Sequence, residues 1–235
     1  MEKVNKLKEH FRRYHPRYRF ILSLPFGSRV LDLGCGDFSA TKKFLKMRPD
    51  LIFSAVDIRD LAGFAPPGVD FCRVDIQREP LPFDDSCLDA IYCSHVLEHL
   101  YTTSLISGEI RRALKAGGRI YIETPGTRSL WVPSFQYGRE QDIPLNFYDD
   151  PTHQKPFSKT GLFIFLKKLV FEVIRTGTAR NPWSLLLAPY FLFRGLLFRD
   201  RLLFTHAVWE VLGWSIYAVG YNLRKDDAKG KAPIF

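Results

Sequence analysis

The chain has 235 residues, 46% of them hydrophobic, which fits one α/β domain with a full core and excludes a disordered chain. Its formal net charge of +9 indicates an anionic partner, such as a phosphate, a nucleic acid or a lipid surface. The four cysteines form no Cys-x-x-Cys pair and the charged N-terminus lacks the apolar core of a secretory signal, so we expect reduced thiols and a cytoplasmic location.

Residues 1–26 form a basic segment, rich in Lys and Arg. Apolar residues recur through it at helical spacing: Val4, Leu7, Phe11 and Tyr14. The pattern predicts an amphipathic helix up to Pro16. A cap helix with a solvated basic face is the favoured interpretation, and contact with an anionic surface is the alternative. We expect residues 27–235 to form one domain.

A strand, a Gly-x-Gly turn and a helix follow one another at residues 30–47. Val30, Leu31 and Leu33 are branched and apolar, as in a buried strand, and residues 40–47 have helical spacing. Gly34 and Gly36 leave the backbone between them open to a ligand. This order opens a nucleotide-binding α/β unit, although an ordinary glycine-rich turn is the simpler alternative.

The next strand, residues 51–57, ends in a carboxylate. Asp57 lies about 20 residues beyond the turn, the distance at which an acidic side chain accepts hydrogen bonds from a ribose. An aspartate that only shapes the end of the strand is the alternative. Position and spacing together favour the ribose role.

Strands and helices then alternate along the chain. We expect strands at residues 69–76, 86–94 and 119–124, and helices at 95–100 and 105–115, the second ending at a glycine C-cap. This alternation predicts a parallel sheet with right-handed crossovers.

The last third contains an apolar insertion. Ser158 caps a helix over residues 159–169, and strands at 171–176 and 215–223 form the antiparallel edge of the sheet. Between these strands lie residues 177–214, which are rich in Leu, Phe and Trp and interrupted by arginines. The apolar runs are too short to span a bilayer. Residues 181–211 suit a membrane surface, and a lid over the substrate or a dimer contact are the alternatives.

Several motifs in this order resemble one family. They are Val-Leu-Asp-Leu-Gly-Cys-Gly at 30–36, Asp57, Asp75-Ile76, Leu-Pro-Phe-Asp-Asp-Ser at 81–86, Leu-Asp-Ala-Ile at 88–91, Val-Leu-Glu-His-Leu at 96–100 and Leu-Lys-Ala-Gly-Gly-Arg at 114–119. Residues 29–125 resemble class I S-adenosylmethionine (SAM)-dependent methyltransferases of the small-molecule and ubiquinone-biosynthesis-like group. The resemblance implies an α/β fold: a Rossmann-like seven-stranded sheet flanked by helices, with an antiparallel last strand.

The resemblance also implies the residues that bind SAM: Asp32, Gly34, Cys35, Gly36, Asp57, Ile58, Asp75, Ile76, Ser94 and His95. By this resemblance Asp57 holds the ribose, Asp75 accepts from the adenine amino group, and Ser94 and His95 flank the methionine moiety and the reacting methyl. The turn lacks the third glycine of the dinucleotide fingerprint, which argues against an NAD-dependent oxidoreductase.

Two groups of residues could activate a methyl acceptor. His95, Glu98 and His99 are spaced to share a helix face, and His153 lies in a polar loop at residues 149–158. A histidine base, His153 or His99, with Glu98 beside it, is the first hypothesis for an O-methylation. A divalent metal held by these residues is the second, and it resembles the Glu-x-x-Glu-His site of quinone and small-RNA O-methyltransferases. His95 stands where that pattern has Glu, so a metal is not favoured.

We therefore expect a SAM-dependent methyltransferase, acting on the oxygen of a lipid-linked, glycan or quinone-like acceptor. The apolar insertion further suggests peripheral contact with the cytoplasmic face of a membrane, and nucleic acid is the less favoured partner. The alternative is a non-catalytic binding subunit with the same fold, docking a nucleic acid or a protein through its basic N-terminus. The sequence does not define the acceptor or the oligomeric state.

Overall fold

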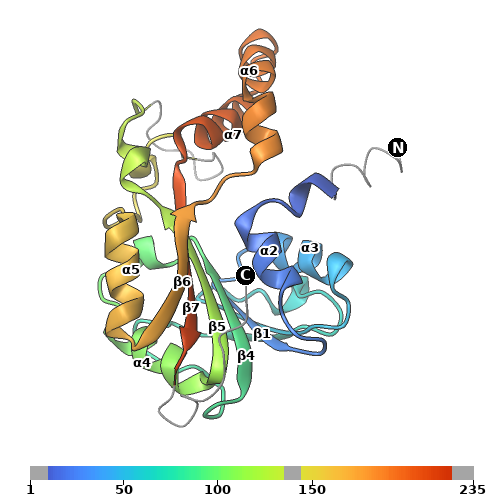
Figure 1. Cartoon of the computed structure of the whole chain (residues 1–235), viewed down its shortest axis with the longest axis vertical. Coiled ribbons are helices and arrows are strands. Elements are labelled where there is room, and N and C mark those ends of the chain that lie inside the picture. The colour runs from blue at the N-terminus through green and yellow to red at the C-terminus, as the bar shows by residue number, and fades with distance from the viewer. Residues whose placement is uncertain (1–9, 135–143, 224–235) are drawn as a thin grey trace.

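A seven-stranded sheet lies at the centre of the computed structural model, which describes residues 10–134 and 144–223 (Figure 1). The strands lie in the order β3-β2-β1-β4-β5-β7-β6. Their bounds are β1 Arg29–Leu33, β2 Ile52–Asp57, β3 Asp70–Arg73, β4 Leu88–Ser94, β5 Leu114–Pro125, β6 Phe171–Thr178 and β7 Ser215–Asn222.

Strands β1 to β5 run parallel, and β7 is antiparallel to both of its neighbours, β5 and β6. The branched residues Val30, Leu31 and Leu33 are fully buried, as expected for a parallel strand covered on both faces. This topology confirms the predicted Rossmann-like sheet with an antiparallel last strand. The carboxyl ends of the parallel strands therefore meet at one edge, where ligands bind in open α/β sheets.

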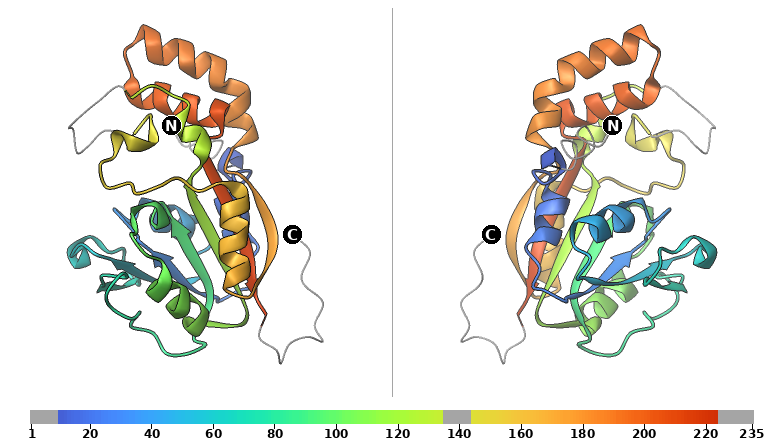
Figure 2. Two further views of the ribbon diagram at one scale, coloured as in Figure 1. Left: turned by 90° about the vertical axis from the view of Figure 1, so that its left-hand side faces the viewer. Right: turned by 90° about the vertical axis from the view of Figure 1, so that its right-hand side faces the viewer.

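Helices cover both faces of the sheet (Figures 1 and 2). On one face α4 and α5 bury Ile110 and Leu166, and on the other α2 and α3 bury Phe20 and Phe44. The helices are α2 Pro16–Leu22, α3 Ser39–Met47, α4 Ser104–Ala113, α5 Lys159–Lys168, α6 Pro182–Leu197 and α7 Arg201–Leu212, with short 3-10 turns η1 Ala62–Phe64, η2 Leu97–His99, η3 Thr127–Leu130 and η4 Phe147–Asp149. Ser158 caps α5 as predicted, accepting from the Gly161 N–H.

The N-terminal segment differs from the prediction. Most of the predicted helix lies in residues 1–9, outside the described residues, and residues 10–12 are helical. A second helix, α2, begins at Pro16, whose fixed φ suits the first helical position. The side chain of His15 caps it by accepting from the Arg17 N–H.

Two further predictions were wrong. Residues 95–100 form only the single turn η2, because His95 adopts a left-handed conformation (φ 57°) and its N–H donates to the Glu123 carbonyl. The predicted glycine C-cap after α4 is also absent. Gly117 and Gly118 lie inside β5, since this strand begins at Leu114 and forms ladders with β4 and β7.

The insertion between β6 and β7 folds into the hairpin of α6 and α7. It projects beyond the carboxyl edge of the sheet (Figures 1 and 2). A Cβ on Gly195 would lie 2.8 Å from Phe204 Cβ and 2.9 Å from its backbone N, so glycine is needed where the two helices cross. Within residues 10–134 and 144–223, no helix combines the length and hydropathy that crossing a membrane requires.

Candidate functional site

The turn after β1 forms an open backbone loop at the carboxyl edge of the sheet. The N–H groups of Gly34 and Cys35 donate to the Val56 carbonyl at 2.8 and 3.1 Å, which ties the loop to β2. Gly34 has φ +77°, and a Cβ there would lie 2.3 Å from Val96 Cγ2. Only glycine fits this position, because the loop packs directly against Val96, the residue after His95.

Asp57 lies beside this loop and is held by hydrogen bonds. Its Oδ2 accepts from the Gly36 N–H at 2.9 Å and from Arg59 Nη2 at 3.3 Å, and its Oδ1 accepts from the Arg59 N–H and Nε at 3.1 and 3.0 Å. Burial alone would raise the pKa of Asp57, but the bonds from Arg59 and Gly36 outweigh it, so this pKa lies below its usual value. The carboxylate is thus ionised and positioned for hydroxyl donors.

The other predicted cofactor residues lie around the same strand ends. Asp32 is buried beneath the loop, where Thr41 of α3 donates to it, and burial raises its pKa to about 7. Cys35 is also buried, and burial raises its pKa to about 12. Ile58 is exposed beside Asp57, as an adenine-contacting residue must be before the ligand binds.

Asp75 and Ile76 follow β3, next to the end of β2. Asp75 accepts from the Gln77 N–H at 3.1 Å, and the Asp57 carbonyl accepts from the Val74 N–H at 2.9 Å. Ile76 packs against the core beneath. The strand ends therefore bring these residues to the Gly34–Gly36 loop, and their roles toward SAM remain predictions.

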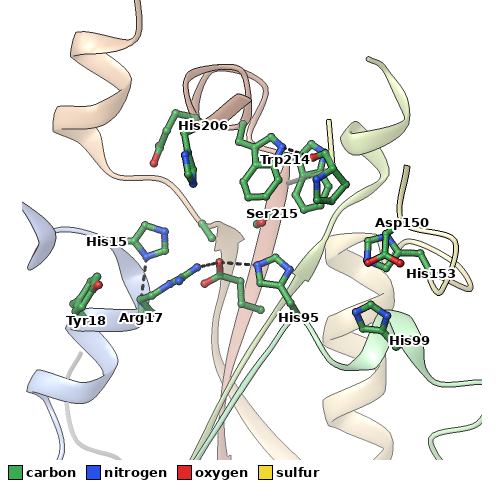
Figure 3. Close-up of a pocket in the computed structure, with 15 residues that line it drawn as sticks. His15, Arg17, Tyr18, His95, His99, Asp150, His153, His206, Trp214 and Ser215 are labelled. Atoms are coloured by element: carbon green, nitrogen blue, oxygen red, sulfur yellow. Dashed lines mark hydrogen bonds and ion pairs between the residues drawn. The ribbon is translucent and has the colours of Figure 1, made fainter. Parts of the chain in front are cut away.

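A pocket of about 460 Å³ opens at the same edge, between α2, α7 and the ends of β4 and β5 (Figure 3). Five histidines line it, together with aromatic and acidic side chains. Its lining residues are His15, Arg17, Tyr18, His95, His99, Glu123, Pro144, Asp150, His153, Ala179, His206, Trp209, Glu210, Trp214 and Ser215. The pocket thus joins the N-terminal segment, the hairpin and the strand ends in one chamber.

Two stacked indole rings form one wall of the pocket. The rings of Trp209 and Trp214 lie 4.3 Å apart at an interplanar angle of 12°. Their N–H groups donate to the carbonyls of Pro144 and Leu145 at 3.0 and 2.8 Å, which fixes both rings. The wall is therefore rigid, and a flat or ring-shaped acceptor could pack against it.

A buried ionic network crosses the floor of the pocket. Arg17 of α2 donates to Glu123 at the end of β5, and Tyr121 donates to the same carboxylate. His95 lies between two carboxylates, with Nδ1 3.1 Å from Glu98 Oε1 and Nε2 3.7 Å from Glu123 Oε1. The network fastens α2 to the sheet across the site.

The charge of His95 follows from these neighbours. Burial alone would lower the pKa of His95, but the hydrogen bonds and negative charges of Glu123 and Glu98 raise it to about 9. His95 is thus a cation at neutral pH, with both ring nitrogens protonated. It can position carboxylates, but it cannot accept a proton from an acceptor.

His99 and His153 form a pair at the other side of the pocket, with ring centroids 4.7 Å apart. The Phe147 carbonyl lies 2.6 Å from His153 Nδ1, and because a carbonyl only accepts, Nδ1 carries the proton. Thr152 donates to Asp150 at 2.6 Å, so its oxygen accepts from His99 Nδ1 at 2.7 Å. In the neutral form of each histidine the lone pair is therefore on Nε2.

The surroundings of this pair favour a neutral His99. Burial is the main cause that lowers the pKa of His99, and the nearby His153 adds to it. Asp150 Oδ2 lies 3.7 Å from His153 Nε2, and Thr152 helps to hold the pKa of Asp150 below its usual value against its burial. If His153 accepts a proton at Nε2, the negative charge of Asp150 stabilises the resulting imidazolium.

Glu98, His99 and His153 could also hold a metal, since each offers a ligand atom within 4.8 Å of the others. Glu98 is fully buried, however, and its oxygens already accept from His95 at 3.1 Å and from Thr124 at 3.0 Å. These bonds give Glu98 a positioning task in the network. They argue against a free ligand set for a divalent ion.

Sequence reasoning missed Arg17, Glu123 and the indole wall. Glu123 carried a usable signal, because it is a carboxylate at the carboxyl end of a parallel strand, as Asp57 is. Arg17 carried no such signal, since its partner, Glu123, lies 106 residues away in the sequence. The indole wall likewise depends on how the insertion folds back over the pocket.

Comparisons with known proteins agree with this geometry. Residues 31–122 match the family model described as a methyltransferase domain. A probable S-adenosylmethionine-dependent methyltransferase of Mycolicibacterium smegmatis is 29% identical over 166 residues, covering 69% of this chain and 59% of its own. The ubiquinone/menaquinone biosynthesis C-methyltransferase UbiE of Desulfotalea psychrophila is 30% identical over 129 residues, covering 52% of each chain.

Among solved structures, a SAM-dependent methyltransferase from Archaeoglobus fulgidus aligns with a TM-score of 0.61 at 21% identity, over 92% of this chain and 93% of its own. The chain spans between about half and three fifths of the length of the two curated relatives above. The domain match over residues 31–122 and these relatives support the predicted resemblance to the class I SAM-dependent methyltransferases. SAM is the cofactor of that class.

Proposed function

We propose that the chain binds SAM at the Gly34–Gly36 loop and transfers its methyl group to a hydroxyl oxygen held in the adjoining pocket. The observation that carries this proposal is the His99–His153 pair. Two imidazoles whose neutral forms carry the lone pair on Nε2 line this pocket. His95 also lines it, and the next residue, Val96, packs against Gly34 of the cofactor loop. Such a pair suits a reaction that must remove a proton from its acceptor.

Bound SAM supplies an electrophilic methyl group on a sulfonium. The pocket aligns the acceptor oxygen with that methyl, and alignment alone contributes strongly to a bimolecular displacement. His153 Nε2 would accept the hydroxyl proton as the oxygen takes up the methyl group and the methyl–sulfur bond breaks, its electron pair leaving with the sulfur as a neutral thioether. Asp150 would stabilise the resulting imidazolium. His99 is the neighbouring acceptor for this proton. Glu98 and His95 position the floor of the site.

A methylated carbon or nitrogen is less suited to this site. The His99–His153 pair is placed to take a proton from an acceptor that carries an acidic hydrogen, such as a hydroxyl. The stacked rings of Trp209 and Trp214 suit a ring or a sugar. We propose an oxygen on a lipid-linked, glycan or quinone-like molecule. We also propose that residues 181–211 contact a membrane surface, because the outer side of the hairpin is apolar.

The cofactor loop makes a specific prediction about Arg59. Asp57 accepts four hydrogen bonds, two of them from the Arg59 side chain, so a ribose must displace that side chain. Arg59 is 61% exposed and free to swing into solvent. Replacing it (Arg59→Ala) should strengthen SAM binding by up to about fivefold, the worth of an exposed ion pair. Calorimetric titration with SAM measures this, with Arg29→Ala, at the exposed amino end of β1, as the control.

Weaker SAM binding by Arg59→Ala would contradict this account. It would show that Arg59 contacts the cofactor instead of competing with the ribose for Asp57.

The direct test of the function is transfer of a radiolabelled methyl group from SAM to a cell extract fractionated into lipid, glycan and RNA. We expect label in the lipid or glycan fraction, and full activity after exhaustive treatment with EDTA. Loss of activity on chelation, restored by a divalent ion, would favour the metal over the histidine base.

The competing function is a non-catalytic binding subunit. Salt-dependent RNA binding without methyl incorporation would favour it. Nicotinamide binding without affinity for SAM would instead favour an oxidoreductase.

A further inference from the structure

The outer side of helix α6 and the turn after it expose a large apolar surface. Six large side chains there are each more than half exposed: Leu186, Tyr190, Phe193, Leu196, Leu197 and Phe198. We call these residues the α6 surface. They lie at the end of the molecule that projects beyond the sheet (Figures 1 and 2). A contiguous apolar surface of this kind marks an interaction site.

The α6 surface is broad. At 100° per residue, the exposed apolar positions of α6 spread over more than half of its circumference, and Ala188 and Gly195 mark the narrow side buried against α7. A helix that pairs with one other helix shows a narrower apolar stripe. A broad apolar surface suits a continuous apolar medium, such as the acyl region of a bilayer.

The charges of the hairpin are those of an interfacial element. Arg194, Arg199 and Arg201 are its only Lys or Arg residues, and they lie at or near the turn. The guanidinium carbon of Arg194 lies 5.9 and 5.2 Å from the ring centroids of Tyr190 and Phe198, so its positive charge sits directly on the apolar surface.

The hairpin contains two acidic residues, and both have structural tasks. Asp200 caps α7 by accepting from the Leu203 N–H at 3.0 Å. Glu210 faces the pocket and accepts from the Asn181 N–H at 3.0 Å. The turn is therefore basic and apolar together, the combination that anionic headgroups and acyl chains attract.

We propose that the α6 surface docks on an anionic membrane and that the methyl acceptor enters the pocket from that membrane. The second part rests on the proposed function. The inner side of α7 carries His206 and Trp209 into the pocket, so one hairpin forms both the docking surface and a pocket wall. Docking therefore places the pocket beside the bilayer surface, where a lipid-linked acceptor presents its polar head.

Co-sedimentation of the full chain with vesicles tests the docking. We expect binding to vesicles of phosphatidylglycerol and phosphatidylcholine mixed in equal parts, and weaker binding to phosphatidylcholine alone. Phe193→Asp with Phe198→Asp should reduce binding by at least about tenfold, because two aromatic side chains no longer insert. Arg194→Glu with Arg199→Glu should reduce it similarly at low salt and less at 0.5 M salt, where charges are screened.

Matched controls separate docking from general effects of the substitutions. Phe26→Asp changes an exposed phenylalanine next to the amino end of β1, at the opposite edge of the sheet. Lys167→Glu with Lys168→Glu reverses two exposed charges at the end of α5. Both controls should bind vesicles as the unaltered chain does. Thermal unfolding of each variant shows whether it is folded.

The proposal fails if the chain ignores anionic vesicles, or if the α6 variants bind as well as the controls. It also fails if Phe193→Asp with Phe198→Asp converts a dimer into a monomer in sedimentation velocity, since a second copy would then cover the surface. Vesicle binding needs neither SAM nor an acceptor. Lost docking with intact SAM binding therefore overturns the membrane contact of the hairpin and leaves the proposed methyl transfer standing. Lost SAM binding with intact docking overturns the proposed methyl transfer, and with it the entry of the acceptor from the membrane, and leaves the docking standing.

Discussion

Replacing the proposed base, His153→Ala, should reduce methyl transfer by about 10²- to 10⁴-fold, the usual contribution of general base catalysis. His153 is held by the Phe147 carbonyl and packs on the Phe147 ring at 4.5 Å, so its Nε2 is fixed at the pocket. Affinity for SAM should not change, because the cofactor loop lies at other strand ends. Initial rates with saturating SAM, together with calorimetric titration, measure both quantities.

Two comparisons sharpen this prediction. His99→Ala should have a smaller effect than His153→Ala if His99 only receives the proton later. His10→Ala, outside the pocket, is the matched control. If His153→Ala kept more than a tenth of the activity of the unaltered enzyme, the proposed base would be wrong.

The second large effect concerns the buried network. Glu123→Gln should destabilise the fold by about 3 to 5 kcal/mol, because it leaves the Arg17 guanidinium and the His95 imidazolium without their shared carboxylate. Urea unfolding monitored by circular dichroism measures the change. Glu79→Gln, at an exposed glutamate, should change stability by less than about 0.5 kcal/mol. A similar small change for Glu123→Gln would show that the network does not stabilise the fold.

The effect of Glu123→Gln should also depend on pH. Burial would raise the pKa of Glu123, but Arg17 and His95 outweigh it and hold this pKa well below its usual 4.5, so its contribution is present above pH 4.5 and lost toward lower pH. The pKa of His95 is raised from 6.5 to about 9, so its contribution is present below pH 6.5 and lost as the pH rises through 9. The difference between the two proteins should therefore be largest between pH 4.5 and 6.5 and smaller at pH 10.

The sheet was predictable because its signals are local. The apolar residues Val30, Leu31 and Leu33, the turn at Gly34 and Gly36 and the carboxylate at Asp57 each lie within a few residues of the strand end that they mark. Alternation of strands and helices then fixes a parallel sheet, and its carboxyl edge defines where the site must lie.

The interior of the pocket was not predictable in the same way. Arg17 reaches Glu123 only because α2 folds over this edge of the sheet. The ring of Trp214 stacks on that of Trp209 across the helix end at Gly213, and both indoles border the pocket because the hairpin folds over the same edge. The predicted helix at residues 95–100 failed for a related reason. The N–H of His95 donates to the carbonyl of Glu123, a distant residue, and His95 adopts a left-handed backbone that helical spacing cannot reveal.

The choice among the histidines also needed the structure. The sequence pointed to His153 or His99 as the base and to His95 beside the methionine moiety of SAM, but it carried no information on the charge of each ring. Two carboxylates make His95 a cation, whereas the Phe147 carbonyl and Thr152 leave the other two rings with a free Nε2. Hydrogen-bond partners, not spacing, therefore distinguish a positioning residue from a base.

Calorimetric titration of the chain with SAM and, separately, with NAD tests the central claim most directly. The arrangement of Gly34, Gly36 and Asp57 predicts one SAM per chain, and Asp57→Ala should weaken that binding because the ribose loses its acceptor. No heat of binding with SAM, or binding of NAD in its place, would contradict the account.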